Sequence, residues 1–283
     1  MNIDAHQHFW KFDAARDTWI TDPMQVIRKD FLPRDLAPDL KANGIDACIT
    51  VQADSSENDT RFLLELAEND PQIAGVVGWV DLRSPQLEER LKAFSKFPKL
   101  RGFRHVAQSE TDNRFLVQPE FTAGIARLRE FNFTYDILVL PRQLPAAIEL
   151  VAMFPEQPFV IDHLGKPDVR TRTSTRWPEK IKKLACYPNV YGKISGLLTE
   201  ADWYRWKPAD FVPFLDAAFE AFGPDRLMFG SDWPVCLVAG TYSQVRQSIA
   251  EYVEKNAPAA KAKIFGENAA HFYDVTQSYG VKG

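Results

Sequence analysis

Two histidines near the start of the chain have the types and spacing that most readily suggest chemistry. His6 and His8 are separated by one residue at the end of the stretch Asn2–His8. If this stretch is a β-strand, side chains two positions apart point the same way, so the two imidazoles project together and Asp4 lies one layer deeper. Because imidazole nitrogen is a common zinc ligand, the pair indicates a metal site or a pair of imidazole hydrogen-bond donors.

Residues of the same kind end two later apolar runs. Asp162-His163 ends the run Pro158–His163, and Ser231-Asp232 ends the run Leu227–Asp232. Three imidazoles and one carboxylate suit a single divalent ion, and zinc suits imidazole best. The predicted metal ligands are His6, His8, His163 and Asp232. A lone buried histidine is more often an ordinary core residue, so this prediction depends on the four lying together.

The elements that must position these residues follow a regular alternation. Short β-branched apolar runs are expected to be buried parallel strands. They are Asn2–His8, Ala47–Gln52, Ile73–Val80, Leu100–Val106, Phe133–Leu138, Pro158–His163, Val190–Ser195 and Leu227–Asp232. The amphipathic segments that predict helices are Asp59–Asn69, Pro85–Phe97, Pro119–Phe131, Leu144–Phe154, Trp177–Tyr187, Pro208–Phe222 and Tyr242–Asn256. Alternating strands and helices predict a parallel sheet.

Eight such units predict an α/β fold, a single (β/α)₈ TIM barrel that spans residues 1–283 as one domain. A barrel of this type uses about 250 residues, which is nearly the whole chain. Neither a GxGxxG turn after the first strand nor a GxxxxGK[ST] loop is present, so the sequence lacks nucleotide-binding signatures. Since barrel chemistry takes place at the carboxyl ends of the strands, the histidines stand where an active site is expected.

The amino-acid composition limits the classes of binding partner that we expect. The net charge is −4 without a basic block, and no run of 18 apolar residues occurs, which argues against nucleic acid and membrane as partners. The three cysteines are far apart in the sequence and make no CxxC pair. With no signal peptide at the start, these features favour a reducing, cytoplasmic location. A homo-oligomer is left open.

The motifs together resemble the amidohydrolase superfamily, and within it the sugar lactonases related to L-fuconolactonase and L-rhamnonolactonase. The matching stretches are DAHQHFW, VQAD, GVVGWVDL, LRGFRH, DHLGKP, GKISGL, RLMFGSDWPV and the tail FGENAAHFYDV. The resemblance implies a hydrolase that opens the ring of a sugar-acid lactone, and it assigns metal or catalytic roles to the two first-strand histidines, His163 and Asp232. Arg104 or His105 would contact the substrate.

Two superfamily features are absent. Binuclear members carry a bridging lysine on strand four and a histidine on strand five, whereas this chain has Arg101–His105 and Phe133–Asp136 there. The resemblance therefore implies one divalent metal, with zinc expected. Because some lactonase relatives work without metal, a metal-free site in which the imidazoles act as donors stays open.

A mechanism follows as a hypothesis. Asp232 would act as the general base that activates water. His163 and either Arg104 or His105 would stabilise the oxyanion. Trp10 would contact the apolar face of the sugar, with Trp203 or Trp206 as further candidates; Gln52 and Lys193 would bind its hydroxyls, although Lys193 fits a structural ion pair equally well.

Two other functions remain open. The chain could be a dicarboxylate or aromatic lactone hydrolase, or a non-oxidative decarboxylase of the same superfamily; such substrates call for several arginines at the barrel mouth. A barrel that binds a ligand without catalysis is the third reading, and the intact set of histidines and Asp232 argues against it.

Overall fold

The computed structural model describes residues 1–171 and 176–275, and its eight strands form one parallel sheet in sequence order. The strands are β1 (Ile3–Gln7), β2 (Ala47–Val51), β3 (Ile73–Gly78), β4 (Leu100–His105), β5 (Thr134–Ile137), β6 (Phe159–Ile161), β7 (Val190–Ile194) and β8 (Leu227–Phe229). Every strand lies within one of the eight predicted runs. The last eight residues of the predicted domain lie outside the described residues.

The sheet closes into a barrel just beyond the end of β8. The backbone N–H of His8 donates to Trp233 O at 2.7 Å, and that of Asp232 donates to His6 O at 2.8 Å. The two ends of the sheet are therefore joined by the same residues that the sequence singles out for chemistry. Backbone hydrogen bonds hold His6, His8 and Asp232 in a fixed relation to one another.

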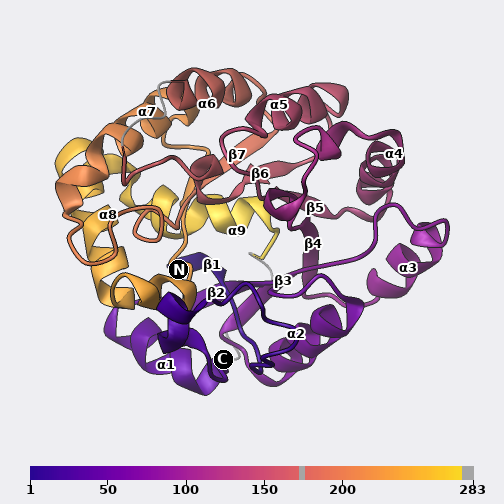
Figure 1. Ribbon diagram of the computed structural model, residues 1–283, viewed down its shortest axis with the longest axis horizontal. Helices are drawn as coiled ribbons and strands as arrows, with labels where there is room; N and C mark the ends of the chain where they lie inside the picture. Colours follow the sequence, from indigo (N-terminus) through magenta and orange to yellow (C-terminus); the bar gives the residue numbers. More distant parts are fainter. Residues whose placement is uncertain (172–175, 276–283) are drawn as a thin grey trace, which may run out of the picture.

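Helices surround the barrel as a ring (Figure 1). They are α1 (Pro33–Ala42), α2 (Glu57–Asn69), α3 (Leu87–Phe94), α4 (Pro119–Leu128), α5 (Leu144–Met153), α6 (Trp177–Ala185), α7 (Val212–Phe222) and α8 (Tyr242–Asn256), while the short α9 (Asn268–Phe272) lies apart from the ring (Figure 1). Seven of them match predicted segments. Helix α1 was not predicted because it contains Pro38, a residue that usually interrupts a helix. None of the described helices is long and apolar enough to span a membrane.

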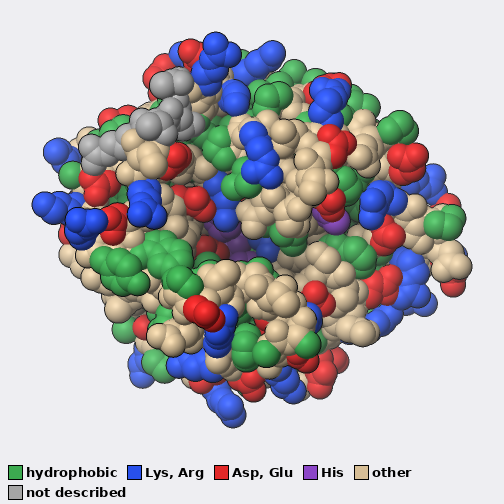
Figure 2. All heavy atoms as spheres, in the orientation of Figure 1, with side chains coloured by type: hydrophobic (Ala, Val, Ile, Leu, Met, Phe, Trp, Pro, Cys, Tyr) green, Lys and Arg blue, Asp and Glu red, His purple; other side chains and the backbone are tan. Residues whose placement is uncertain are grey.

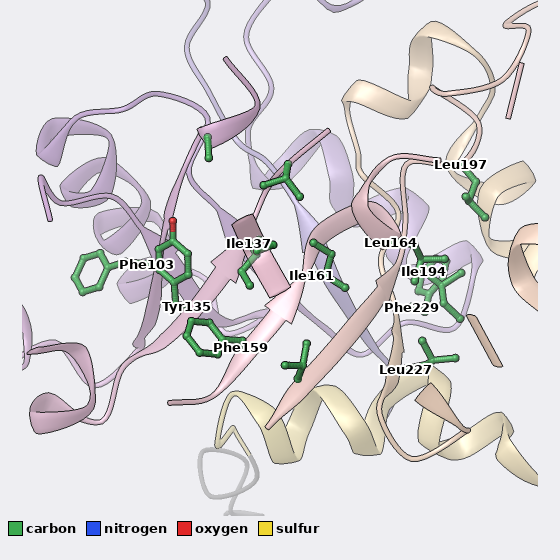
Figure 3. Close-up of a cluster of buried hydrophobic side chains, with 14 of the residues drawn as sticks. Phe103, Tyr135, Ile137, Phe159, Ile161, Leu164, Ile194, Leu197, Leu227 and Phe229 are labelled. Carbon is green, nitrogen blue, oxygen red and sulfur yellow. The ribbon is translucent and has the colours of Figure 1, made fainter. Parts of the chain in front are cut away.

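The larger hydrophobic core lies between the barrel and the helices. Phe103, Tyr135 and Phe159 occupy equivalent positions on β4, β5 and β6, and all three are buried. Figure 3 shows these rings on neighbouring strands. Phe121 of α4 packs edge-on against Tyr135, with ring centroids 6.0 Å apart. Odd-numbered positions on these strands therefore face the helices, and even-numbered positions face the barrel interior.

A second core fills the bottom of the barrel and is covered by the C-terminal segment. Ala269, Phe272 and Tyr273 pack against interior residues such as Ile3 and Val77. In Figure 1, α9 (yellow) crosses the centre of the ring of helices. We call residues 268–275 the C-terminal plug. Because the plug covers the amino end of the barrel, the open pocket of the described residues lies at the carboxyl ends of the strands.

The expectation for Asp4 was wrong. The pairing of β1 with β2 contains one extra β1 residue between Asp4 and Gln7, a bulge that breaks the regular alternation. As a result Asp4 points outward, where it accepts hydrogen bonds from Ser231 N at 2.9 Å and from the hydroxyl of Tyr242 at 3.0 Å. Asp4 braces the barrel seam rather than lying beneath the histidine pair.

Candidate active site

Three predicted metal ligands meet at the carboxyl end of the barrel. His6 Nε2 lies 3.2 Å from His8 Nε2, and Asp232 Oδ1 lies 3.5 Å from His8 Nε2 and 3.9 Å from His6 Nε2. All three side chains are buried. Ligands about 2.0–2.1 Å from a tetrahedral zinc ion stand about 3.3 Å from each other, so these separations approach those of a zinc site.

The partners on the far side of each ring decide which nitrogen is free. His8 Nδ1 lies 2.7 Å from Val51 O, an oxygen that only accepts, so Nδ1 carries the hydrogen and Nε2 keeps its lone pair. His6 Nδ1 lies 3.2 Å from Asp162 Oδ1, and Arg104 Nη1, which only donates, lies 3.4 Å from His6 Nε2. Both contacts favour the tautomer of His6 whose Nε2 lone pair faces the site, whereas Lys193 Nζ, a donor 3.2 Å from Nδ1, favours the other tautomer.

This donor set fits a divalent cation. When Nε2 of His6 and Nε2 of His8 both keep their lone pairs, two imidazole lone pairs and one carboxylate oxygen converge, and a cation between the three atoms relieves their mutual repulsion. The donors are nitrogen and oxygen, as zinc prefers. His6, His8 and Asp232 therefore form a candidate metal centre.

His163 lies beside this trio but at a greater distance. Its Nε2 is 4.0 Å from Asp232 Oδ1, and its ring centroid is 4.5 Å from that of His6. On the other side, its Nδ1 lies 2.9 Å from Ser195 Oγ. The structure thus brings all four predicted ligands together around one carboxylate oxygen, with His163 as the outermost.

Two members of the site have strained backbones. Asp232 has φ 58° and His163 has φ 52°, both in the left-handed region that non-glycine residues rarely adopt. Leu164 and Lys166 share this conformation, so the whole turn after β6 is left-handed. Such strain persists where surrounding contacts fix the backbone, and it is concentrated at functional sites.

Glycines make room for two of the imidazoles. A Cβ at Gly230 would lie 2.6 Å from the Cβ of His6, and a Cβ at Gly196 would lie 2.7 Å from Nδ1 of His163. Gly196 also has φ 68°, which favours glycine on its own account. The motifs GKISGL and RLMFGSDWPV therefore contain residues that serve His163 and His6 by their lack of a side chain.

Arg104 points into the barrel, whereas His105 does not. Arg104 donates to Gln52 Oε1 at 2.7 Å through Nη2 and to Asp162 Oδ2 at 3.1 Å through Nη1. His105, the next residue on β4, faces the helices, where its ring stacks on Phe115 and its Nε2 lies 2.8 Å from Glu110 Oε1. Adjacent strand residues face opposite sides, so the structure leaves His105 outside the site.

Gln52 and Lys193 lie behind the site rather than on its surface. Gln52 is fully buried and holds the guanidinium of Arg104. Lys193 is also fully buried, with its Nζ 3.0 Å from Asp162 Oδ1 and in contact with Asp136. Of the two interpretations of Lys193, the ion-pair interpretation agrees with these contacts.

A pocket of about 420 Å³ opens over the candidate metal centre. Trp10, Trp19 and Trp203 line it, together with the ion pair of Lys166 and Glu200, whose charged atoms are 3.2 Å apart. Figure 2 shows a hollow at the centre of this face with histidine side chains at its bottom. Of the predicted sugar-contacting tryptophans, Trp10 and Trp203 line this pocket. Trp206 donates instead to Ala239 O and is not among the lining residues.

Burial sets the protonation states. Burial lowers the pKa of His163 to about 4 and that of His6 well below its usual value. Burial alone would raise the pKa of Asp232, but His163, His8 and His6 around its carboxylate outweigh this effect and lower it. At neutral pH, His6 and His163 are therefore neutral, as metal ligands must be, and Asp232 carries the negative charge.

The comparisons with known proteins agree with this geometry. The family model described as Amidohydrolase matches residues 3–275. The chain belongs to the amidohydrolase family. An L-fucono-1,5-lactonase from Burkholderia multivorans is 44% identical over 96% of both chains, and one from Burkholderia ambifaria is 36% identical over 98% of this chain and 97% of its own. A crystal structure of a B. multivorans amidohydrolase with bound zinc superposes with a TM-score of 0.93 at 42% identity, covering 97% of this chain and 99% of its own.

Three elements of this amidohydrolase site were not predicted from the sequence. Asp162 was noted only as the residue before His163, and Asp136 was noted only for the absence of a strand-five histidine. Trp19 lines the pocket from the segment that follows β1, which carries no strand or helix pattern. For the two aspartates a signal was present, because charged residues inside apolar strand runs must have buried partners.

Proposed function

We propose that the chain hydrolyses a neutral sugar-acid lactone, an aldonolactone such as L-fucono- or L-rhamnono-lactone, to the free acid. The observation that carries this proposal is a pocket whose floor is the His6, His8 and Asp232 set and whose wall is aromatic. The names of the two Burkholderia relatives support the substrate class. Aromatic faces suit the C–H face of a sugar ring, and a carboxylate beside imidazoles suits ester hydrolysis.

We further propose that His6, His8 and Asp232, with His163 beside them, hold one divalent ion, zinc. When bound there, zinc would polarise the lactone carbonyl and lower the pKa of a water molecule. The zinc-bound B. multivorans structure supports this choice of metal. The metal-free alternative, in which the imidazoles act as hydrogen-bond donors, conflicts with the hydrogen placement that Val51 O imposes on His8.

Side chains of the protein supply the proton transfer, the oxyanion stabilisation and the substrate contacts. Asp232 is ionised and lies just beyond β8, so it takes the proton of the attacking water and returns it to the ring oxygen released when the lactone opens. Arg104 lines the pocket and only donates, so its guanidinium stabilises the negative oxygen that forms when the carbonyl is attacked. His163 also lines the pocket, and it contacts the substrate from the side of Asp232. Trp10 and Trp203 pack on the sugar ring.

The charges of the pocket argue against a dicarboxylate or aromatic acid as the substrate. Arg104 and Lys166 are the cationic side chains among the described lining residues, and each is already paired with a carboxylate, Asp162 and Glu200 respectively. Asp54 and Glu200 line the pocket as well and would repel a second carboxylate. A neutral polyol lactone meets no such repulsion.

A pH-indicator assay on a panel of lactones tests the proposal. The panel contains L-fucono-, L-rhamnono- and L-galactono-lactones, a dicarboxylate lactone and a carboxylated aromatic. We expect acid release from at least one aldonolactone, loss of this activity after treatment with a chelator, and its return with zinc. Acid release from none of the aldonolactones, or CO₂ release from the aromatic acid, would overturn the proposed substrate class. Full activity after complete metal removal would overturn the proposed metal role alone.

A further inference from the structure

We propose that the C-terminal plug controls the metal affinity of the site through a buried chain of side chains. The contacting side chains are, in order, Tyr273, Asp136, Lys193, Asp162 and His6. This series acts by setting which nitrogen of His6 carries the hydrogen. This inference rests on the proposed role of His6 as a metal ligand. It makes Tyr273, Asp136, Lys193 and Asp162 positioning residues, since their contacts lead to the metal ligand rather than into the pocket.

The contacts form one continuous series inside the barrel. The Tyr273 hydroxyl donates to Asp136 Oδ2 at 2.8 Å, and Lys193 Nζ donates to the same oxygen at 2.5 Å. Lys193 Nζ also lies 3.0 Å from Asp162 Oδ1, which lies 3.2 Å from Nδ1 of His6. All five side chains are buried. Direct contacts between side chains therefore connect the plug with the metal ligand.

The positive and negative charges of this series and of the adjoining Arg104 are equal in number, so each charged group needs its partner. Asp136 and Asp162 carry negative charges, and Lys193 and Arg104 carry positive ones; Arg104 donates to the second oxygen of Asp162 at 3.1 Å. An unpaired charge in such a dry interior is costly. Lys193 must therefore stay between its two carboxylates and Arg104 beside Asp162, so a change at one end of the series alters the contacts at the other.

Lys193 is the point at which the tautomer of His6 is decided. Its Nζ lies 3.2 Å from His6 Nδ1, and an ammonium only donates hydrogen bonds. If Lys193 donated to Nδ1, the hydrogen of His6 would move to Nε2 and the metal would lose a ligand. Asp162 favours the opposite state, because its Oδ1 has no hydrogen-bond partner among the described residues and lies 3.2 Å from Nδ1, where its negative charge attracts a hydrogen. The carboxylate of Asp136 draws Lys193 away from Nδ1 and so favours the metal-binding tautomer.

Tyr273 is needed to hold Asp136 in that role. The other oxygen of Asp136, Oδ1, has no hydrogen-bond partner among the described residues, so the bonds to Oδ2 fix the carboxylate. The ring of Tyr273 also lies beneath the ammonium, with Lys193 Nζ 5.4 Å from the ring centroid. Tyr273 follows α9 at the barrel bottom. The plug that closes the barrel thus supplies the last link to the metal ligand.

Zinc affinity measured against a chromophoric chelator tests the inference. The test variant is Tyr273→Phe, which removes only the hydroxyl. The matched control is Tyr252→Phe, which also removes a hydroxyl that donates to a carboxylate, that of Asp216 at 2.6 Å, but on the outer surface between α7 and α8. Loss of outer-shell partners weakens metal binding by about 10–100-fold, and we expect Tyr273→Phe to weaken zinc binding toward the lower end, about tenfold. The control should bind zinc as the unmodified chain does.

A second measurement needs no metal. In metal-free protein with ¹⁵N-labelled histidine, the nitrogen shifts of His6, assigned with His6→Ala, report its tautomer. We expect mainly Nδ1–H in the unmodified chain and a larger share of Nε2–H in Tyr273→Phe. Equal tautomer ratios and equal zinc affinities in Tyr273→Phe and the unmodified chain would overturn the inference. If His6→Ala binds zinc as tightly as the unmodified chain, the proposed metal site fails instead.

Discussion

The Nε2 atoms of His6 and His8 face each other across 3.2 Å, although Val51 O holds the hydrogen of His8 on the opposite nitrogen and Asp162 favours the same placement in His6. The carboxylate of Asp232 adds a third acceptor at 3.5 Å from His8. Backbone hydrogen bonds at the barrel seam keep these groups in place. The metal-free protein therefore holds repelling groups together, and a bound cation should stabilise it strongly.

The first prediction is that zinc raises the melting temperature of the unmodified chain and not that of His6→Ala or His8→Ala. At a zinc concentration of about 100 times its Kd, binding adds about 2.7 kcal/mol to the free energy of unfolding, which corresponds to a rise of about 4–5 °C for a chain of this length. Calorimetry with and without zinc measures this shift. His271→Ala is the control, because this histidine is exposed and far from the site. A full zinc shift in His6→Ala would remove His6 from the ligand set.

The second prediction concerns the general base. Asp232→Asn should lower kcat by about 10²–10⁴-fold, because an amide cannot take a proton from water. Asparagine tolerates the left-handed backbone at φ 58°, so the fold should be kept. Asp274→Asn is a matched control, since Asp274 also has positive φ, at 50°, but is exposed. Near-normal kcat in Asp232→Asn at every pH would show that another group activates the water.

Much of the fold was predictable because parallel strands are buried on both faces. Such strands appear as short apolar runs, and all eight were found in the right places. The bulge in β1 was not predictable, since one extra residue leaves the apolar pattern of the strand intact. Its effect was to turn the Asp4 side chain outward to Tyr242, away from the imidazole of His6.

The candidate site was predicted to the extent that its residues end strands. His6, His8, His163 and Asp232 follow this rule, and the structure brings them together. The sequence does not show which face of β4 points inward, so Arg104 and His105 could not be distinguished. The ion-pair role of Lys193 depends on carboxylates from two other strands, which only the closed barrel brings within reach.

The third prediction separates the two tryptophans that the sequence offered as alternatives. Trp203 lines the pocket, whereas Trp206 does not, although both donate their indole N–H to a backbone oxygen, at 2.8 Å and 2.7 Å. Trp203→Leu should raise KM for an aldonolactone by about 2–10-fold, the value of one aromatic contact, with little change in kcat. Trp206→Leu should change stability and leave KM unaltered. Steady-state kinetics on both variants checks this, and an equal rise in KM for both would contradict it.

The last prediction compares two glycines with the same backbone conformation. Gly196 has φ 68° and Gly44 has φ 64°, so an alanine at either position should reduce the free energy of unfolding by about 1–2 kcal/mol. At Gly44 the added methyl would meet nothing within 4 Å, whereas at Gly196 it would lie 2.7 Å from Nδ1 of His163. Gly196→Ala must therefore displace the imidazole and break its contact with Ser195.

A displacement of about 1 Å at a catalytic group can cost about 10²-fold in rate, so Gly196→Ala should lose activity far beyond its loss of stability. Gly44→Ala should lose stability alone. Urea unfolding and kcat measured on the same preparations separate the two effects. If Gly196→Ala lost no more activity than Gly44→Ala, the position of His163 would not matter for the reaction, and its assignment to the site would be wrong.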